Sequence, residues 1–149
     1  MSVLHAFRAG VIAAIAADSV FSGVQVLAVP PGENEALKES VFVQSASSAH
    51  EFRGIGVGQR RIKENIELTL AVRTYSEGPD HLDAGELTLT RAELLSGAIG
   101  NVIADSPTIG GVVSFARMSR RTIRPVPAAH GWAAEATVTV SAESYPDQA

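Results

Sequence analysis

The sequence predicts an α+β domain: a mainly antiparallel sheet with two helices packed on one face, in the order α-β-β-β-α-β-β. Two segments carry apolar residues at helical spacing, which predicts the helices. Elsewhere apolar and polar residues alternate with a period of two, which is typical of strands with one buried face. The 149 residues, 46% of them hydrophobic, suit a single domain over 1–149 with one core.

The N-terminal part is expected to form one helix and two strands. Residues 3–17 have apolar side chains at helical spacing, and Ser2 is a candidate cap. Short strands are expected over 23–29 and 41–44. Residues 45–60 are small, polar and rich in glycine, with little periodicity. They are interpreted as a long mobile loop that serves binding rather than the core.

The clearest strand covers 61–75, where apolar residues alternate with charged and polar ones. An acidic connection, 77–89, follows it, and the sequence leaves open whether the end of this connection is helical. Near the C-terminus, residues 132–142 alternate in the same way and are expected to close a hairpin.

The second helix is expected to begin at Thr90, because Thr90 and Glu93 form a capping box before an apolar run. Apolar residues over 94–103 fall in pairs four apart, which predicts one buried face that includes Leu94. Gly97 and Gly100 each lower helix propensity by about 1 kcal/mol, so a close backbone, that of the sheet, is expected beside them.

A tight turn with two glycines is expected after this helix, followed by a strand over 112–118. Pro125 and Pro127 are expected to break the chain before the last strand, because proline cannot donate a hydrogen bond to a sheet.

Composition excludes several classes of protein. The chain has no cysteine, which excludes a disulfide framework, a thiolate metal site and a cysteine nucleophile. No apolar run approaches the ~18 residues of a membrane span, and no signal-peptide pattern occurs. A soluble protein without membrane contact is therefore expected.

The net charge of −4 is unevenly distributed. Eight of the 12 basic residues lie in two segments without acidic residues, 53–63 and 117–124, which leaves the rest of the chain strongly acidic. One interpretation is head-to-tail contact between copies, or contact with an oppositely charged partner. The other interpretation is a pair of solvated strand ends.

No motif for catalysis or cofactor binding is present. The glycines of 54–58 depart from the dinucleotide fingerprint and precede a strand pattern rather than a helix. His81 lies near Asp80 and Asp83, but a solvated loop is favoured over a metal site there. Phe52 could stack on a base, yet an aromatic content of 5% argues against a dedicated nucleic-acid reader. We expect no enzyme, no metal and no cofactor.

In its order of elements the chain resembles the tail terminator proteins of long-tailed bacteriophages, especially those with actinobacterial hosts. The resemblance covers most of the chain: a short N-terminal helix, the strand over 23–29, a β pair ending in the strand over 62–75, and a helix running into the phrase ADSPTIGGVV at 104–113. A basic strand and a last alternating strand follow. The phrase at 104–113 is the most family-like piece, and it is a structural turn without chemistry.

This resemblance implies a ring of probably six copies in the virion, at the head-proximal end of the tail, assembled in the host cytoplasm. The ring would cap the tail tube, end its polymerisation and offer its other face to a neck or head-completion protein, while genomic DNA passes through without specific recognition. Two alternatives stay open. The chain could be another neck or tail protein, such as a head-completion or tube subunit, or a monomeric small-ligand-binding α+β domain.

The segment 44–61 is the candidate contact with the tube or a neighbouring copy, with Phe52 as an apolar anchor and arginines as charge partners. The second basic segment is the candidate for pairing with an acidic neighbouring surface. The candidate interface residues are Phe52, Arg53, Arg60, Arg61, Lys63, Arg117, Arg120, Arg121 and Arg124.

Overall fold

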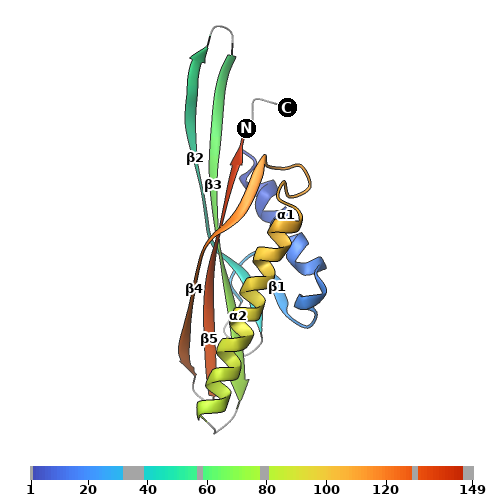
Figure 1. The fold of residues 1–149 in the computed structure, drawn as a ribbon, viewed down its shortest axis with the longest axis vertical. Helices are drawn as coiled ribbons and strands as arrows, with labels where there is room; N and C mark the ends of the chain where they lie inside the picture. The colour runs from blue at the N-terminus through green and yellow to red at the C-terminus, as the bar shows by residue number, and fades with distance from the viewer. Residues whose placement is uncertain (1, 32–38, 57–58, 78–80, 129–130, 146–149) are drawn as a thin grey trace.

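The computed structural model describes residues 2–31, 39–56, 59–77, 81–128 and 131–145, without the side chains of 52–61, 77, 81–84 and 127–128. It shows two helices on one face of a five-stranded sheet (Figure 1). In chain order the elements are α1 (Leu4–Ala17), a 3₁₀ turn (Ser19–Phe21), β1 (Gln25–Leu27), β2 (Ser40–Gly56), β3 (Gln59–Glu77), α2 (His81–Asp105), β4 (Phe115–Ala128) and β5 (Gly131–Ser144).

The strand order in the sheet is β1-β2-β3-β5-β4. The pair β1–β2 is parallel, and the other three pairs are antiparallel. This arrangement confirms the predicted α+β class, the predicted order of elements and the placement of both helices on one face. No helix in the described part of the chain is both long and apolar enough to cross a membrane.

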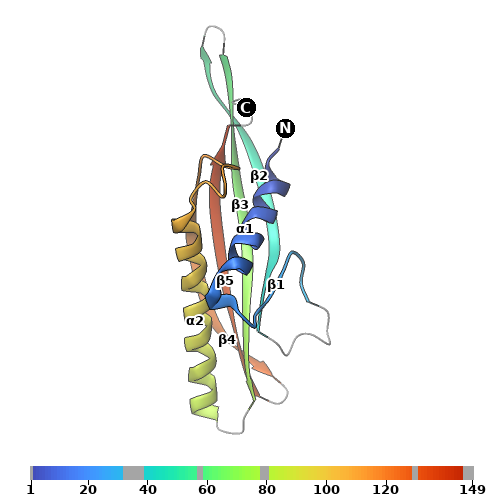
Figure 2. The same cartoon turned by 90° about the vertical axis from the view of Figure 1, so that its right-hand side faces the viewer.

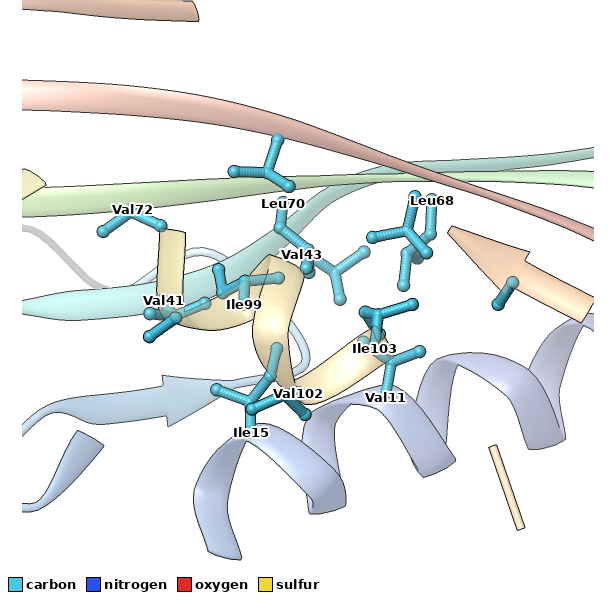
Figure 3. Packing of buried hydrophobic residues seen from close by; sticks show 14 of the residues in the cluster. Val11, Ile15, Val41, Val43, Leu68, Leu70, Val72, Ile99, Val102 and Ile103 are labelled. Atoms are coloured by element: carbon cyan, nitrogen blue, oxygen red, sulfur yellow. The ribbon is translucent and has the colours of Figure 1, made fainter. Parts of the chain in front are cut away.

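The core lies between the sheet and the two helices (Figure 3). On β3 the even-numbered residues from Ile66 to Val72 are at most 1% exposed and face the helices. From the helices, Val11, Ile15 and Ile99 are fully buried against them. Each strand buries one set of alternate side chains, so the odd-numbered residues of β3 lie on the helix-free face of the sheet.

The prediction of a loop over 45–60 was wrong. β2 continues to Gly56 and β3 begins at Gln59, with pairs such as Ser47 opposite Glu67. Residues 44–51 are exposed to solvent. Because neither face of this part of β2 is buried, no alternation of apolar and polar residues marks it as a strand.

The prediction of the helix start at Thr90 was also wrong, because α2 begins at His81. The extra turns pack on the sheet. Thr88 is 3% exposed, and its carbonyl oxygen accepts a 2.9 Å hydrogen bond from the Thr74 hydroxyl. Gly85 packs beside the Trp132 ring of β5. These tertiary contacts extend the helix past the residue that sequence capping rules favour.

Pro125 and Pro127 do not end β4, which continues to Ala128. β4 is an edge strand, so a proline whose nitrogen faces away from β5 interrupts no bond of the ladder. The strand starts at Phe115 rather than at 112, because Ile109, Gly110 and Gly111 adopt positive φ angles and extend the turn. The strand predicted over 23–29 shortens to Gln25–Leu27.

The sheet does approach Gly97 and Gly100, but through side chains of β4 rather than through its backbone. A Cβ atom on Gly100 would lie 3.0 Å from Cε of Met118. A Cβ atom on Gly97 would meet only a guanidinium nitrogen of Arg121, at 3.7 Å. A closer approach occurs at Gly10 of α1, where a Cβ atom would lie 2.6 Å from Cγ2 of Ile109.

These distances predict opposite effects of two glycine substitutions on the free energy of unfolding. Gly97→Ala is expected to raise it by about 0.5–1 kcal/mol, because the helix gains propensity without a clash. Gly10→Ala is expected to lower it by about 1–3 kcal/mol, because the branched, buried Ile109 cannot move aside easily. Urea unfolding of the two variants beside the wild type tests both signs. Stabilisation by Gly10→Ala would contradict the close packing of α1 on the 106–114 turn.

Candidate functional site

The end of the hairpin formed by β2 and β3 projects beyond the rest of the sheet (Figures 1 and 2). Pairing between β3 and β5 begins at Glu64 opposite Ser144, whereas β2 and β3 stay paired out to Gly56 opposite Gln59. Residues 52–56 and 59–62, which we name the arm, therefore form a ribbon of two strands, with no third strand of the described part of the chain beside it. Isolated two-stranded ribbons are marginally stable in water, so contact with a further partner would stabilise an arm of this kind.

Four predicted interface residues lie on this arm: Phe52, Arg53, Arg60 and Arg61. The structure places their backbones in β2 and β3, with Phe52 opposite Ile62. Their side chains lie outside the described residues, so the structure brings the four positions together without defining their contacts. Lys63 stands at the base of the arm and is 6% exposed. Its Nζ lies 2.9 Å from a Glu143 carboxylate oxygen. Lys63, which was predicted to contact a partner, therefore already forms an ion pair within the chain.

A buried carboxylate fastens the base of the arm to the start of α1. Glu64 is fully buried, and its Oε1 accepts a 3.0 Å hydrogen bond from the Val3 backbone N–H. Its Oε2 lies 3.1 Å from Nε2 of His50, the residue directly opposite on β2. The Val3 N–H satisfies Oε1, whereas Oε2 approaches His50 without the geometry of a hydrogen bond. Glu64 thus contacts both β2 and the segment before α1.

Glu64→Ala is expected to lower the free energy of unfolding by about 1–3 kcal/mol, because it leaves the Val3 N–H without its acceptor. Glu64→Gln is the matched control. Its amide oxygen can still accept from Val3 and its NH₂ group can donate to His50, so a change within about 1 kcal/mol is expected. Chemical unfolding measures both variants, and hydrogen exchange in α1 shows whether the loss is local to that helix. Equal stability of all three proteins would show that this contact does not hold α1 in place.

A β-bulge sorts the second basic segment onto two faces of the sheet. The register between β4 and β5 shifts between Met118 and Arg120. Arg117 and Arg120, three residues apart, consequently pair with Ser141 and Thr139 and lie on the same helix-free face. Arg121 lies on the helix side, where its Nη1 donates a 3.4 Å hydrogen bond to the Ser96 hydroxyl.

The arginines of the helix-free face differ in their partners. Glu135 is 8% exposed and accepts hydrogen bonds from Arg73, at 3.0 Å, and from Arg124, at 3.3 Å. Arg124 is thus paired within the chain. Arg117 and Arg120 are exposed and form no ion pair among the described residues. On the helix-free face of the predicted basic segment, Arg117 and Arg120 are the arginines without an acidic partner among the described residues.

Phe115, which sequence reasoning did not select, stands beside Arg117 on this surface and is 53% exposed. It lines two open grooves of about 460 and 470 Å³. The first runs along the ends of β3, β4 and β5, and the second lies between β4 and the C-terminal half of α2. No sequence signal separates Phe115 from a core residue, because its exposure follows from the turn that precedes β4.

The two edges of the sheet are protected differently. On β4 the Ala116 N–H donates a 2.7 Å hydrogen bond to the Pro107 carbonyl, and the two prolines near the other end have no N–H. β1 pairs with β2 at residues Ser40 to Phe42. Within the described ranges, residues 44–56 of β2 have no strand on their outer side, and they contain no proline. Such an edge is a template for pairing with another chain.

Among the described residues no three His, Asp or Glu side chains gather as metal ligands. The side chains of His81, Asp80 and Asp83, for which the sequence favours a solvated loop over a metal site, lie outside those that the structure describes, so the structure does not test this interpretation. The described surfaces offer exposed arginines, exposed apolar residues and a free strand edge, which are the features of a protein-binding surface.

No known protein family matches the chain, and no curated protein matches its sequence. Solved structures do match. One is a chain in the virion of a native gene transfer agent particle, which is 17% identical, with a TM-score of 0.60 over 93% of this chain and 93% of that chain. At that identity the likeness shows a shared fold over nearly the full length of both chains.

Proposed function

We propose that this chain is a structural protein of a phage-like virion, and specifically the subunit of a ring that caps the tail tube. The observation that carries the proposal is the fold shared with a virion chain over 93% of both chains. The resemblance of the order of elements to tail terminators supports the narrower role. In this proposal the chain binds copies of itself, the tail tube protein and a neck protein, and performs no catalysis.

The shape of the molecule suits an assembly subunit. A lone domain gains little from a two-stranded arm that pairs with no third strand among the described residues, or from an uncovered strand edge. In a ring, each copy can bury these features against its neighbour or against the tube. Heterologous contacts of this kind close into a ring when the rotation between copies is a simple fraction of a turn.

The experiment that tests this proposal measures the native mass of the purified protein and images the same sample by electron microscopy, alone and with purified tail tubes. Closed rings, or tubes capped at one end and no longer able to grow, are the expected result. Open-ended polymers would instead indicate a tube subunit. A protein that stays monomeric and leaves tube ends unchanged would overturn the proposal and favour the ligand-binding alternative.

A further inference from the structure

The outer side of α2 carries an exposed stripe of two leucines and two glutamates. Leu87 is 66% exposed and Leu94 is 52% exposed, although the sequence pattern assigned Leu94 to the core. Glu86 and Glu93 stand next to them and are exposed. Residues seven apart lie on nearly the same side of a helix, so the four side chains form one surface, which we name the acidic stripe. Among the described residues, neither glutamate forms an ion pair.

A separate surface, on β4, carries the complement of this stripe. Figure 1 shows both described helices on one side of the sheet. On the helix-free face, along β4, lie the exposed Phe115, Arg117 and Arg120, which we name the basic face. Phe115 and Arg117 also line the groove between β4 and α2. The acidic stripe and the basic face thus combine apolar side chains with free charges of opposite sign.

The spacing of the charges is similar on the two surfaces. Glu86 and Glu93 are separated by about 10 Å along the helix, given a rise of 1.5 Å per residue. Arg117 and Arg120 lie opposite Ser141 and Thr139, two residues apart on β5, so they are separated by about 7 Å along the strand. Long arginine side chains can span the difference. One copy can therefore set both glutamates against both arginines of another. A symmetric dimer through either surface would instead bring like charges together, which disfavours it.

We infer that the acidic stripe of one copy docks on the basic face of the next copy, so that the helices of each subunit cover the open sheet face of its neighbour. The contact is heterologous, since it joins two different surfaces of the chain, and it can repeat around a ring. It also completes a layered arrangement in which the sheet is covered on both faces. The inference rests on the proposed ring and specifies the surfaces that form it.

A charge-swap mixture tests the pairing. Variant one carries Glu86→Arg and Glu93→Arg, and variant two carries Arg117→Glu and Arg120→Glu. Each variant alone faces like charges, so the concentration for half-assembly is expected to rise by about tenfold or more. Mixed in equal amounts, the variants regain opposite charges at every contact, and rings of alternating subunits are expected. Assembly of each variant alone at wild-type concentrations, or no recovery on mixing, would overturn the pairing.

A cross-linking experiment tests the same pairing of the acidic stripe with the basic face, and it changes only one residue on each surface. The wild-type chain has no cysteine, so a double variant with Leu94→Cys and Arg120→Cys carries no other thiols. A short bis-maleimide is expected to give a ladder of covalent oligomers. The control combines Arg120→Cys with Val29→Cys, since Val29 is as exposed as Leu87 but lies outside both surfaces, and it should give no ladder.

The outcomes separate this inference from the proposed function. A wild-type protein that caps tubes while the Leu94/Arg120 double variant gives no ladder would overturn the docking and leave the terminator role intact. A protein that gives the ladder and recovers on charge-swap mixing, but ignores tail tubes, would support the docking and overturn that role.

Discussion

Replacing residues 52–62 with an Asn-Gly turn is expected to abolish ring formation and tube capping while leaving the domain folded. The replacement joins Glu51 to Lys63, which face each other across β2 and β3, through a two-residue turn that favours a hairpin. In the described part of the chain, the removed residues pair with one another and not with β5, so the replacement breaks no other strand pair. The melting temperature is expected to stay within about 3 °C of the wild-type value. Native mass, electron microscopy and thermal unfolding of the same sample measure the three effects.

A second variant separates the backbone of the arm from its charges. Arg53→Glu, Arg60→Glu and Arg61→Glu keep the length of the ribbon and reverse its charge. We expect weaker tube capping, and we expect the defect to shrink as salt is raised, because screening weakens repulsion between exposed charges. Normal rings and normal capping by the shortened protein would contradict the role assigned to the arm. Loss of the folded state would show instead that the arm supports the core.

Leu70→Ala is expected to lower the free energy of unfolding by about 2–5 kcal/mol. Leu70 is fully buried on β3, the central strand, opposite Val43 on one side and Val138 on the other (Figure 3). Truncating it loses the transfer free energy of the side chain and leaves a cavity between sheet and helices. Because native domains are stable by only about 5–15 kcal/mol, the loss is a large fraction of the total. Chemical unfolding gives the value directly.

Two controls bracket this result. Leu70→Met conserves volume and is expected to cost less than about 1.5 kcal/mol. Leu87→Ala truncates a residue that is 66% exposed and is expected to change stability by no more than about 0.5 kcal/mol. A similar effect of Leu70→Ala and Leu87→Ala would contradict the assignment of the core to the space between β3 and the helices.

The errors of sequence-based prediction have one physical origin. Periodicity detects a strand or helix through its buried face, and it correctly predicted α1, β3 and β5 within a few residues. Residues 44–51 of β2 are exposed and bury no face, so the same logic assigned them to a loop. Pro125 and Pro127 predict a break in a central strand, but an edge strand tolerates them. Leu94 fits the apolar period of α2, yet it faces solvent.

The candidate site was predicted in part. Charge clustering selected both basic segments, and it could not show that a bulge at Met118 to Arg120 divides the second one between two faces. Lys63 and Arg124 were selected as candidate interface charges, but each has an acidic partner within the chain. Lys63 pairs with the distant Glu143, and Arg124 pairs with Glu135 on the neighbouring strand β5. No sequence pattern marks Phe115 and Leu87 as exposed, because the exposure of an apolar residue depends on which elements pack beside it.

The sequence by itself determined the class of fold, the order of its elements and the buried sides of β3 and β5, because these follow from local patterns of apolar residues. Tertiary structure decided where the elements end and which charged groups lack an acidic partner. It extended α2 through contacts of Thr88 with β3, projected the arm by ending β5 at Ser144, and divided the basic segment of β4 between two faces of the sheet. These features arise from contacts between segments distant in the chain, which no local pattern records.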